Sequence, residues 1–77
     1  MATTLERLTA LADATFLGAS NPRLIVRAER IAAELAADGH AALATRLRAV
    51  HRTRGESLGN RYERLQPIIR DYRAELG

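Results

Sequence analysis

Several residue types are missing from this chain of 77 residues, which contains no cysteine, tryptophan or lysine and only three aromatic residues. Without cysteine, neither a disulfide framework nor a cysteine-rich zinc site can stabilise the fold. A domain of this length buries only about 60–65 % of the surface that its unfolded chain exposes. Its stability must therefore come from close packing or from a partner, and a deep catalytic pocket is not expected.

Long apolar runs are also missing. No stretch of 18 apolar residues exists, which excludes a transmembrane helix. Glu6 and Arg7 stand where the apolar part of a secretory signal would begin. All basic residues are arginine and alanine is abundant, as in proteins encoded by GC-rich bacterial genomes. We therefore expect a cytoplasmic bacterial protein that does not bind membranes.

Residues that favour strands are few. The chain has 15 alanines but only two valines and four isoleucines. Alanine and leucine favour helices, whereas β-branched residues favour sheets. The composition predicts an all-α fold with one domain over residues 1–77, a small bundle of three main helices plus a proline-broken C-terminal helix.

Local signals place the expected helices at about 4–17, 22–38, 41–54 and 61–76. Thr3 and Glu6 have the spacing of a capping box, which pairs amide groups at a helix start. Pro22 suits the first position of the second helix, and Gly39 suits a left-handed stop after it. The segment 56–60 is expected to be a linker.

Apolar residues recur at helical spacing in the first three helices. The stripe that the first helix should bury is Leu5, Leu8, Leu11, Ala12 and Phe16. The next two helices should supply the main core. Their expected core residues are Leu24, Ala28, Ile31, Leu35, Leu43, Leu47 and Val50.

The last segment combines a heptad rhythm with a proline. Its apolar residues are spaced alternately four and three apart, as in helices that pack against other helices: Leu58, Tyr62, Leu65, Ile69, Tyr72 and Leu76. Pro67 lies inside this repeat, and an interior proline costs a helix about 3 kcal/mol. We expect a short helix at about 61–65 and a second helix that starts at Pro67. A single kinked helix is the alternative.

Helices this short cannot bury all of these apolar faces, so a strip should remain exposed. Such a strip serves to dock on a partner helix or on a second copy of the chain. We place it on the C-terminal segment. The predicted partner-binding residues are Tyr62, Leu65, Ile69, Tyr72 and Leu76, flanked by Arg48 and Arg52.

The net charge of +3 arises in residues 40–55, which contain arginines but no acidic residue: Arg46, Arg48, Arg52 and Arg54. As an alternative function, these arginines could contact nucleic-acid phosphates, but no aromatic residue is interleaved for base stacking. A solvated or acid-partnered face is the structural alternative. A helix-turn-helix is disfavoured because His40, Thr45 and Arg48 are polar where that motif needs apolar residues.

No pattern for catalysis or metal binding is present. His40 and His51 lie far apart on one expected helix, with no cysteine in the chain, whereas a metal site needs three or four converging ligands. The serines and threonines lack a triad spacing, and no glycine-rich phosphate loop occurs. We expect no catalytic residue, no cofactor and no metal. His40 should form local hydrogen bonds where two helices meet.

Residues 28–48, AERIAAELAADGHAALATRLR, resemble the small helical N-terminal domain of bacterial AAA-family ATPases that are encoded beside subtilisin-like serine proteases. The family pattern of alanine, Ile-Ala-Ala, Gly-His, Leu-Ala and Leu-Arg falls here on segments starting at Ala28, Ile31, Gly39, Leu43 and Leu47. The segment 5–23 corresponds as well. The chain departs from the family at Leu24, where phenylalanine is common, and at 18–22, where an acidic pair is usual.

The resemblance implies a recognition module without its motor, because the chain has no phosphate-binding Gly-x-x-x-x-Gly-Lys motif. Such a module would be a non-catalytic adaptor that presents a helical surface to a protein partner. The implied partner is the ATPase, the protease or a substrate. Self-association into a structural homodimer is a further alternative.

Overall fold

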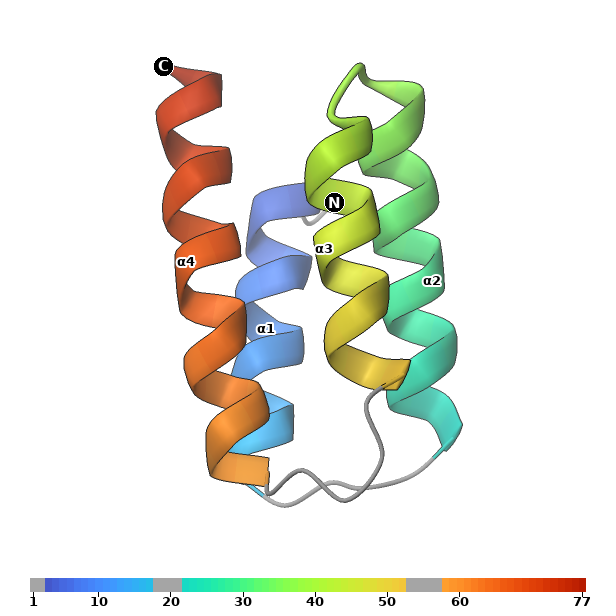
Figure 1. Ribbon diagram of the computed structural model, residues 1–77, viewed down its shortest axis with the longest axis vertical. Helices are drawn as coiled ribbons and strands as arrows, with labels where there is room; N and C mark the ends of the chain where they lie inside the picture. The colour runs from blue at the N-terminus through green and yellow to red at the C-terminus, as the bar shows by residue number, and fades with distance from the viewer. Residues whose placement is uncertain (1–2, 18–21, 53–57) are drawn as a thin grey trace.

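The computed structural model describes residues 3–17, 22–52 and 58–77. These residues form four helices (Figure 1): α1 (Thr4–Phe16), α2 (Pro22–Ala37), α3 (Ala41–Arg52) and α4 (Leu58–Leu76). The three described ranges contain no strand, so the predicted all-α class is confirmed. The first three helices end within two residues of their predicted bounds.

Each helix runs antiparallel to the one before it in the chain, and α4 returns to the side of α1 (Figure 1). Within the described ranges, α1 packs on α2 and α4, and α3 packs on the same two helices. The α2–α3 pair packs most extensively, and the α3–α4 pair packs least extensively. None of these four helices combines the length and the apolar character that crossing a membrane requires.

The start of α1 has the predicted capping box. The Thr3 hydroxyl oxygen accepts a hydrogen bond from the Glu6 amide at 3.1 Å, and the Glu6 carboxylate accepts one from the Thr3 amide at 3.5 Å. Both amides would otherwise lack a partner within the helix. The capping prediction is therefore confirmed.

The turn between α2 and α3 is closed by Gly39, whose φ of +89° is a left-handed conformation that costs other residues energy. The Gly39 amide donates to the Ala36 carbonyl at 3.2 Å, and the His40 amide donates to the Leu35 carbonyl at 2.8 Å. These two bonds make a Schellman motif, which satisfies the last carbonyls of a helix. The predicted glycine stop is confirmed, and its tightness makes α2 and α3 an antiparallel hairpin.

The core lies between the four helices. All seven core residues predicted on α2 and α3 are 7 % exposed or less. The core is completed from α1 and α4 by Leu8, Leu11, Ala12, Leu65, Ile68, Ile69 and Tyr72. One prediction for α1 is wrong, because Phe16 is 61 % exposed.

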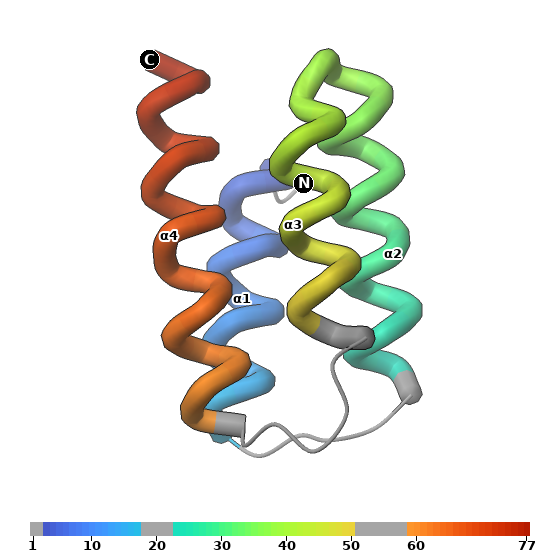
Figure 2. Tube along the Cα trace, viewed as in Figure 1, coloured from blue at the N-terminus to red at the C-terminus, as the bar shows by residue number. Residues whose placement is uncertain are grey.

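The predicted break at Pro67 is not found. α4 continues through Pro67 as one helix, and it begins at Leu58, inside the segment expected to be a linker (Figure 2). The residues Leu65, Ile68, Ile69 and Tyr72 around the proline are all 4 % exposed or less. Burying one large apolar side chain contributes about 1.5–3 kcal/mol. Four such side chains outweigh the roughly 3 kcal/mol that an interior proline costs.

Candidate interaction surfaces

The predicted docking strip on α4 is for the most part core, which corrects the prediction. Leu65 is 0 % exposed, and Ile69 and Tyr72 are each 4 % exposed, because this face of α4 packs on α1 and α3. Tyr62 is half-buried, and its ring lies 4.9 Å from that of Phe16. Only Leu76, at 55 %, is well exposed.

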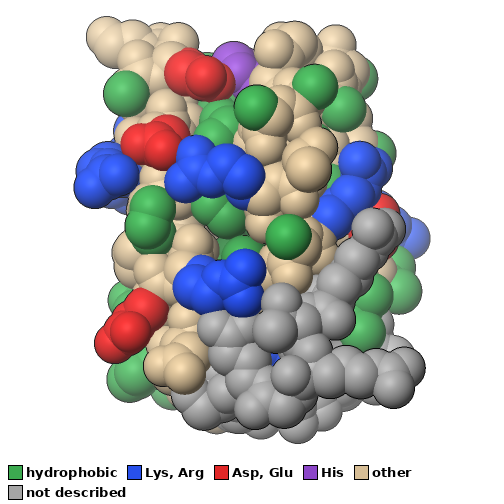
Figure 3. All heavy atoms as spheres, viewed as in Figure 1, with side chains coloured by type: hydrophobic (Ala, Val, Ile, Leu, Met, Phe, Trp, Pro, Cys, Tyr) green, Lys and Arg blue, Asp and Glu red, His purple; other side chains and the backbone are tan. Residues whose placement is uncertain are grey.

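Two of the arginines predicted to flank that strip or to contact phosphates, Arg46 and Arg48, instead pair with acidic residues of neighbouring helices. Arg46 donates to Asp71 of α4 at 2.7 Å, and Arg48 donates to Glu29 of α2 at 3.0 Å. On the face formed by α3 and α4, arginines gather along the seam beside acidic side chains of α4 (Figure 3). The acid-partnered alternative is thus the one found for these two residues. The Arg52 side chain and the whole of Arg54 lie outside the described residues.

A third ion pair joins α1 to α2, between Arg7 and Glu34, and Thr4 also donates to Glu34 at 3.5 Å. The hydrogen bond from Arg7 holds the pKa of the Glu34 carboxyl below its ordinary value and raises the pKa of Arg7. In the same way, the hydrogen bond from Arg46 lowers the pKa of Asp71. The charged form of each carboxylate therefore stabilises the folded state.

His40 links the α2–α3 turn to the end of α4. Its backbone makes the local hydrogen bonds that were predicted for it at the helix junction. Its side chain, 19 % exposed, contacts the Glu75 carboxylate through Nδ1, and its ring meets Tyr72 edge-on at 5.3 Å. We call this group of His40, Tyr72 and Glu75 the tied end.

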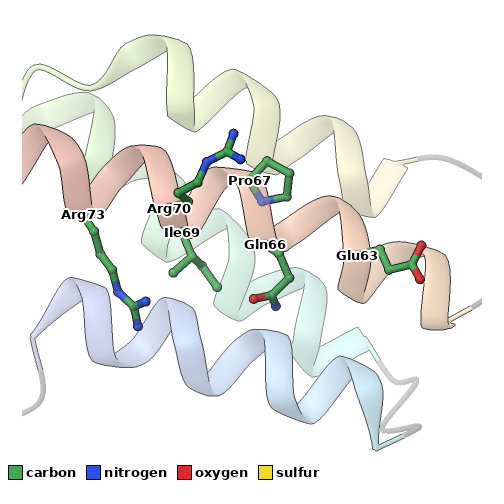
Figure 4. Close-up of a pocket in the computed structure, with 6 residues that line it drawn as sticks. All are labelled: Glu63, Gln66, Pro67, Ile69, Arg70 and Arg73. Atoms are coloured by element: carbon green, nitrogen blue, oxygen red, sulfur yellow. The ribbon is translucent and has the colours of Figure 1, made fainter.

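Two hollows flank Pro67 on α4. The first, of about 430 Å³, is lined by Glu63, Gln66, Pro67, Ile69, Arg70 and Arg73. Gln66, Ile69 and Arg73 point toward α1, and Pro67 lies on the side of α3 (Figure 4). The second, of about 290 Å³, lies between α3 and α4 over Val50 and Ile68. Charges of both signs surround the first hollow, and neither hollow collects the titratable groups of an acid–base pair. In the described part of the chain, no three potential ligands gather for a metal ion.

Five large apolar side chains are well exposed among the described residues, and four of them belong to the same end of the molecule. Phe16 and Leu17, 61 % and 80 % exposed, stand where α1 ends, and Ile25 and Val26, each 52 % exposed, stand where α2 begins. Those two helix ends lie at the same end of the molecule (Figure 1). We call these four residues the apolar end.

The apolar end was not predicted from the sequence. The predicted stripe on α1 assigned Phe16 to the core because it follows Ala12 by four residues. At 100° per residue, however, Phe16 is rotated about 80° from Leu8, which brings it to the edge of the buried face beside Tyr62. The signal in the sequence is the apolar run of Leu24, Ile25 and Val26. Three consecutive residues span about 200° of a helix surface, so they cannot all face one core.

Comparison with known proteins adds no assignment to this geometry. No protein-family model, no curated protein and no solved structure matches the chain. The likeness of residues 28–48 to the ATPase-associated domain stays a prediction.

Proposed function

We propose that this protein is a non-catalytic interaction module that docks on another protein through its apolar end. The observation that carries the proposal is the exposure of Phe16, Leu17, Ile25 and Val26 at one end of the molecule. Several large apolar side chains exposed near one another on a soluble domain often mark a site where it meets a partner. The docking surface therefore moves from α4, where the sequence predicted it, to the α1–α2 end.

The rest of the fold suits a rigid support for such a surface. Ion pairs join α1 to α2, α2 to α3 and α3 to α4, and His40 ties the α2–α3 turn to α4. A side chain on a rigid element loses little entropy when it binds. The apolar end can thus meet a partner without rearrangement of the helices.

The predicted resemblance fits this role, because it implies a recognition module of an AAA-family ATPase, with the ATPase, the protease or a substrate as the partner. Binding to nucleic acid is less well supported. Arg46 and Arg48, two of the four arginines expected to contact phosphates, already pair with Asp71 and Glu29. A phosphate would have to compete with those carboxylates.

Site-specific photo-crosslinking in the cells that produce the protein tests the proposal. Leu17 of the full chain is replaced by p-benzoylphenylalanine, and Val26 is replaced in a second variant. Ala74, exposed on α4 near the other end, is the matched control position. We expect the same partner protein to be joined to positions 17 and 26 and not to position 74.

Three results would overturn the proposal. One is the absence of any adduct at positions 17 and 26, and another is an equal adduct at position 74. The third is an adduct whose mass is twice that of the chain, because it would make the apolar end a homodimer interface instead.

A further inference from the structure

Asp13 stands beside the two exposed apolar side chains of α1. Phe16 follows it by three residues and Leu17 by four, and residues at these spacings are neighbours on a helix surface. The Leu17 amide donates to the Asp13 carbonyl at 3.0 Å, so the helical spacing holds to the end of α1. Asp13 is itself exposed. The α1 half of the apolar end is therefore bordered by a carboxylate.

The Asp13 carboxylate has no partner in the part of the chain that the structure describes. It takes part there in no ion pair and in no side-chain hydrogen bond. The other charged residues of α1 are Glu6, which forms the capping box, and Arg7, which pairs with Glu34 of α2. α1 therefore supplies no cation to Asp13.

The neighbouring helices do not supply one either. On α4, Arg70 donates to Asp71 at 3.4 Å, and Arg73 points toward the first half of α1, away from the end where Phe16 stands (Figure 4). None of the arginines of α2 pairs with Asp13. Its negative charge is neutralised by no contact within the described ranges.

Docking over Phe16 and Leu17 also removes water from the neighbouring carboxylate of Asp13. A charge that loses its water without gaining a partner costs much free energy. A protein that covers the α1 half of the apolar end must therefore bring a cation to Asp13.

The ring of Phe16 favours arginine as that cation. Tyr62 lies against it with ring centroids 4.9 Å apart, yet Phe16 is 61 % exposed, so much of the ring stays open. A guanidinium stacks on an aromatic face and also binds a carboxylate through two parallel hydrogen bonds. The ammonium of lysine is a point charge without this planar fork.

We propose that the apolar end receives a segment of the partner protein in which an arginine, flanked by apolar residues, pairs with Asp13 and lies on the ring of Phe16. This inference rests on the proposed function and specifies the chemistry of the partner. The flanking apolar residues meet Leu17 and the start of α2, where Ile25 and Val26 are exposed.

Charge favours another protein over a second copy of the chain at this place. A two-fold contact brings the same surface patch of both subunits together. Centred on the end of α1, it would set Asp13 of one copy against Asp13 of the other, and facing like charges oppose association.

The test reverses the charge of Asp13 in the crosslinking experiment. Asp13→Lys is combined with p-benzoylphenylalanine at position 26, which lies on α2. Asp38→Lys, at an exposed aspartate of the α2–α3 turn, is the control with the same change in net charge. We expect Asp13→Lys to lower the adduct yield at least about tenfold, since it sets like charges against each other. Asp13→Glu should keep most of the yield, and Asp38→Lys should not change it.

A second pair of variants tests the ring. Phe16→Leu keeps an apolar side chain but removes the aromatic face, and it should lower the adduct yield at position 26 about two- to fivefold. Phe16→Tyr keeps the face and should keep the yield. Equal yields from the two variants would overturn the stacking of the arginine on Phe16.

A charge swap completes the test. The segment of the partner that is joined to position 17 in the chain with native Asp13 is identified by mass spectrometry, and it should contain an arginine among apolar residues. Changing that arginine to glutamate should restore the adduct of the Asp13→Lys chain. Circular dichroism should show the same helix content for the charge variants, because Asp13 and Asp38 are exposed.

The two proposals fail in different ways. Absence of an adduct at position 26 in the chain with native Asp13 overturns the proposed function. An adduct that Asp13→Lys leaves undiminished, or that Asp38→Lys lowers as much, overturns the arginine contact alone. So does a joined segment of the partner that contains no arginine. An adduct of twice the mass of the chain overturns both.

Discussion

The two ends of the molecule differ in how their apolar side chains are covered. At the tied end, where the α2–α3 turn and the end of α4 lie at the same end of the molecule (Figure 1), Tyr72 is 4 % exposed and its ring meets that of His40 edge-on. At the apolar end, Phe16 rests against Tyr62 but is 61 % exposed. Two aromatic residues near helix ends thus have opposite environments.

The difference shows what covers an aromatic side chain in so small a fold. Tyr72 packs in the core, and its ring also meets edge-on the ring of His40 from the α2–α3 turn. His40 itself is fixed by the Schellman turn and by Glu75. Phe16 has one aromatic neighbour in the described part of the chain. The tied end is therefore expected to serve stability, and the apolar end to serve binding.

The largest effect is expected from a matched pair of aromatic truncations. Tyr72→Ala empties a buried site and should lower the free energy of unfolding by about 3–5 kcal/mol. Phe16→Ala removes a side chain that is mostly in solvent and should cost less than about 1 kcal/mol. Urea titration followed by circular dichroism measures both.

That comparison has a clear contrary result. If Phe16→Ala destabilised the protein as much as Tyr72→Ala, Phe16 would belong to the core and the apolar end would lose its principal aromatic contact. The free energy of unfolding of a domain of this size is expected to be only about 4–12 kcal/mol. Tyr72→Phe, which keeps the ring, is the milder variant if Tyr72→Ala does not fold.

The parts of the fold that depend on neighbouring residues were predictable from the sequence. A few neighbouring residues are enough to identify the capping box at Thr3 and the glycine stop at Gly39, and the structure contains both. The periodicity on α2 and α3 also identified the core correctly from Leu24 to Val50. These signals suffice because the two helices form a hairpin, in which each apolar stripe faces the other.

The covering of α4 could not be predicted in the same way. The heptad from Tyr62 to Leu76 shows that a face is apolar, but not whether α1 and α3 or another chain covers it. The same holds for charge. Arg46 finds its acid 25 residues away at Asp71, and Arg7 finds its own 27 residues away at Glu34, so a local charge count made Arg46 look unpaired. Pro67 was misjudged because tertiary packing outweighed its local cost.

A second pair of variants compares glycines toward the two ends. Gly39 at the tied end has a φ of +89°, and an alanine there should cost about 1–2 kcal/mol of stability because of its left-handed backbone. Gly59, near the start of α4, has open space around it. Gly59→Ala should stabilise the helix by up to about 1 kcal/mol. Thermal unfolding measures both, and opposite signs are expected. Destabilisation by both would show that the start of α4 needs its glycine.

A smaller effect should appear as the pH falls. Hydrogen bonds from Arg46 and Arg7 lower the pKa of Asp71 and of Glu34 from their ordinary 3.8 and 4.5. In the acidic range the unfolded chain therefore binds more protons than the folded one, so stability decreases with decreasing pH. The contribution is present above the ordinary pKa and is lost as the pH falls through the lowered one.

Asp71→Asn isolates one of these carboxyl groups. It should lower the melting temperature at pH 7 and make the decrease between pH 5 and pH 2 shallower than in the native chain. Circular dichroism melts across that range provide the comparison. A decrease of unchanged steepness would mean that the ion pair of α3 with α4 is not formed in solution.

The smallest effect on stability is expected at the most exposed residue of the apolar end. Leu17 is 80 % exposed, so Leu17→Ser removes little buried surface and should change the free energy of unfolding by no more than about 0.5 kcal/mol. Its buried counterpart Leu11→Ser, at 0 % exposure, should cost several times as much, because it leaves a cavity and a buried hydroxyl. If Leu17→Ser leaves stability unchanged but weakens capture of a partner at position 26, stability and binding are separated at this end. A large loss of stability would instead give Leu17 a structural role, and an exposed leucine would no longer indicate a docking surface.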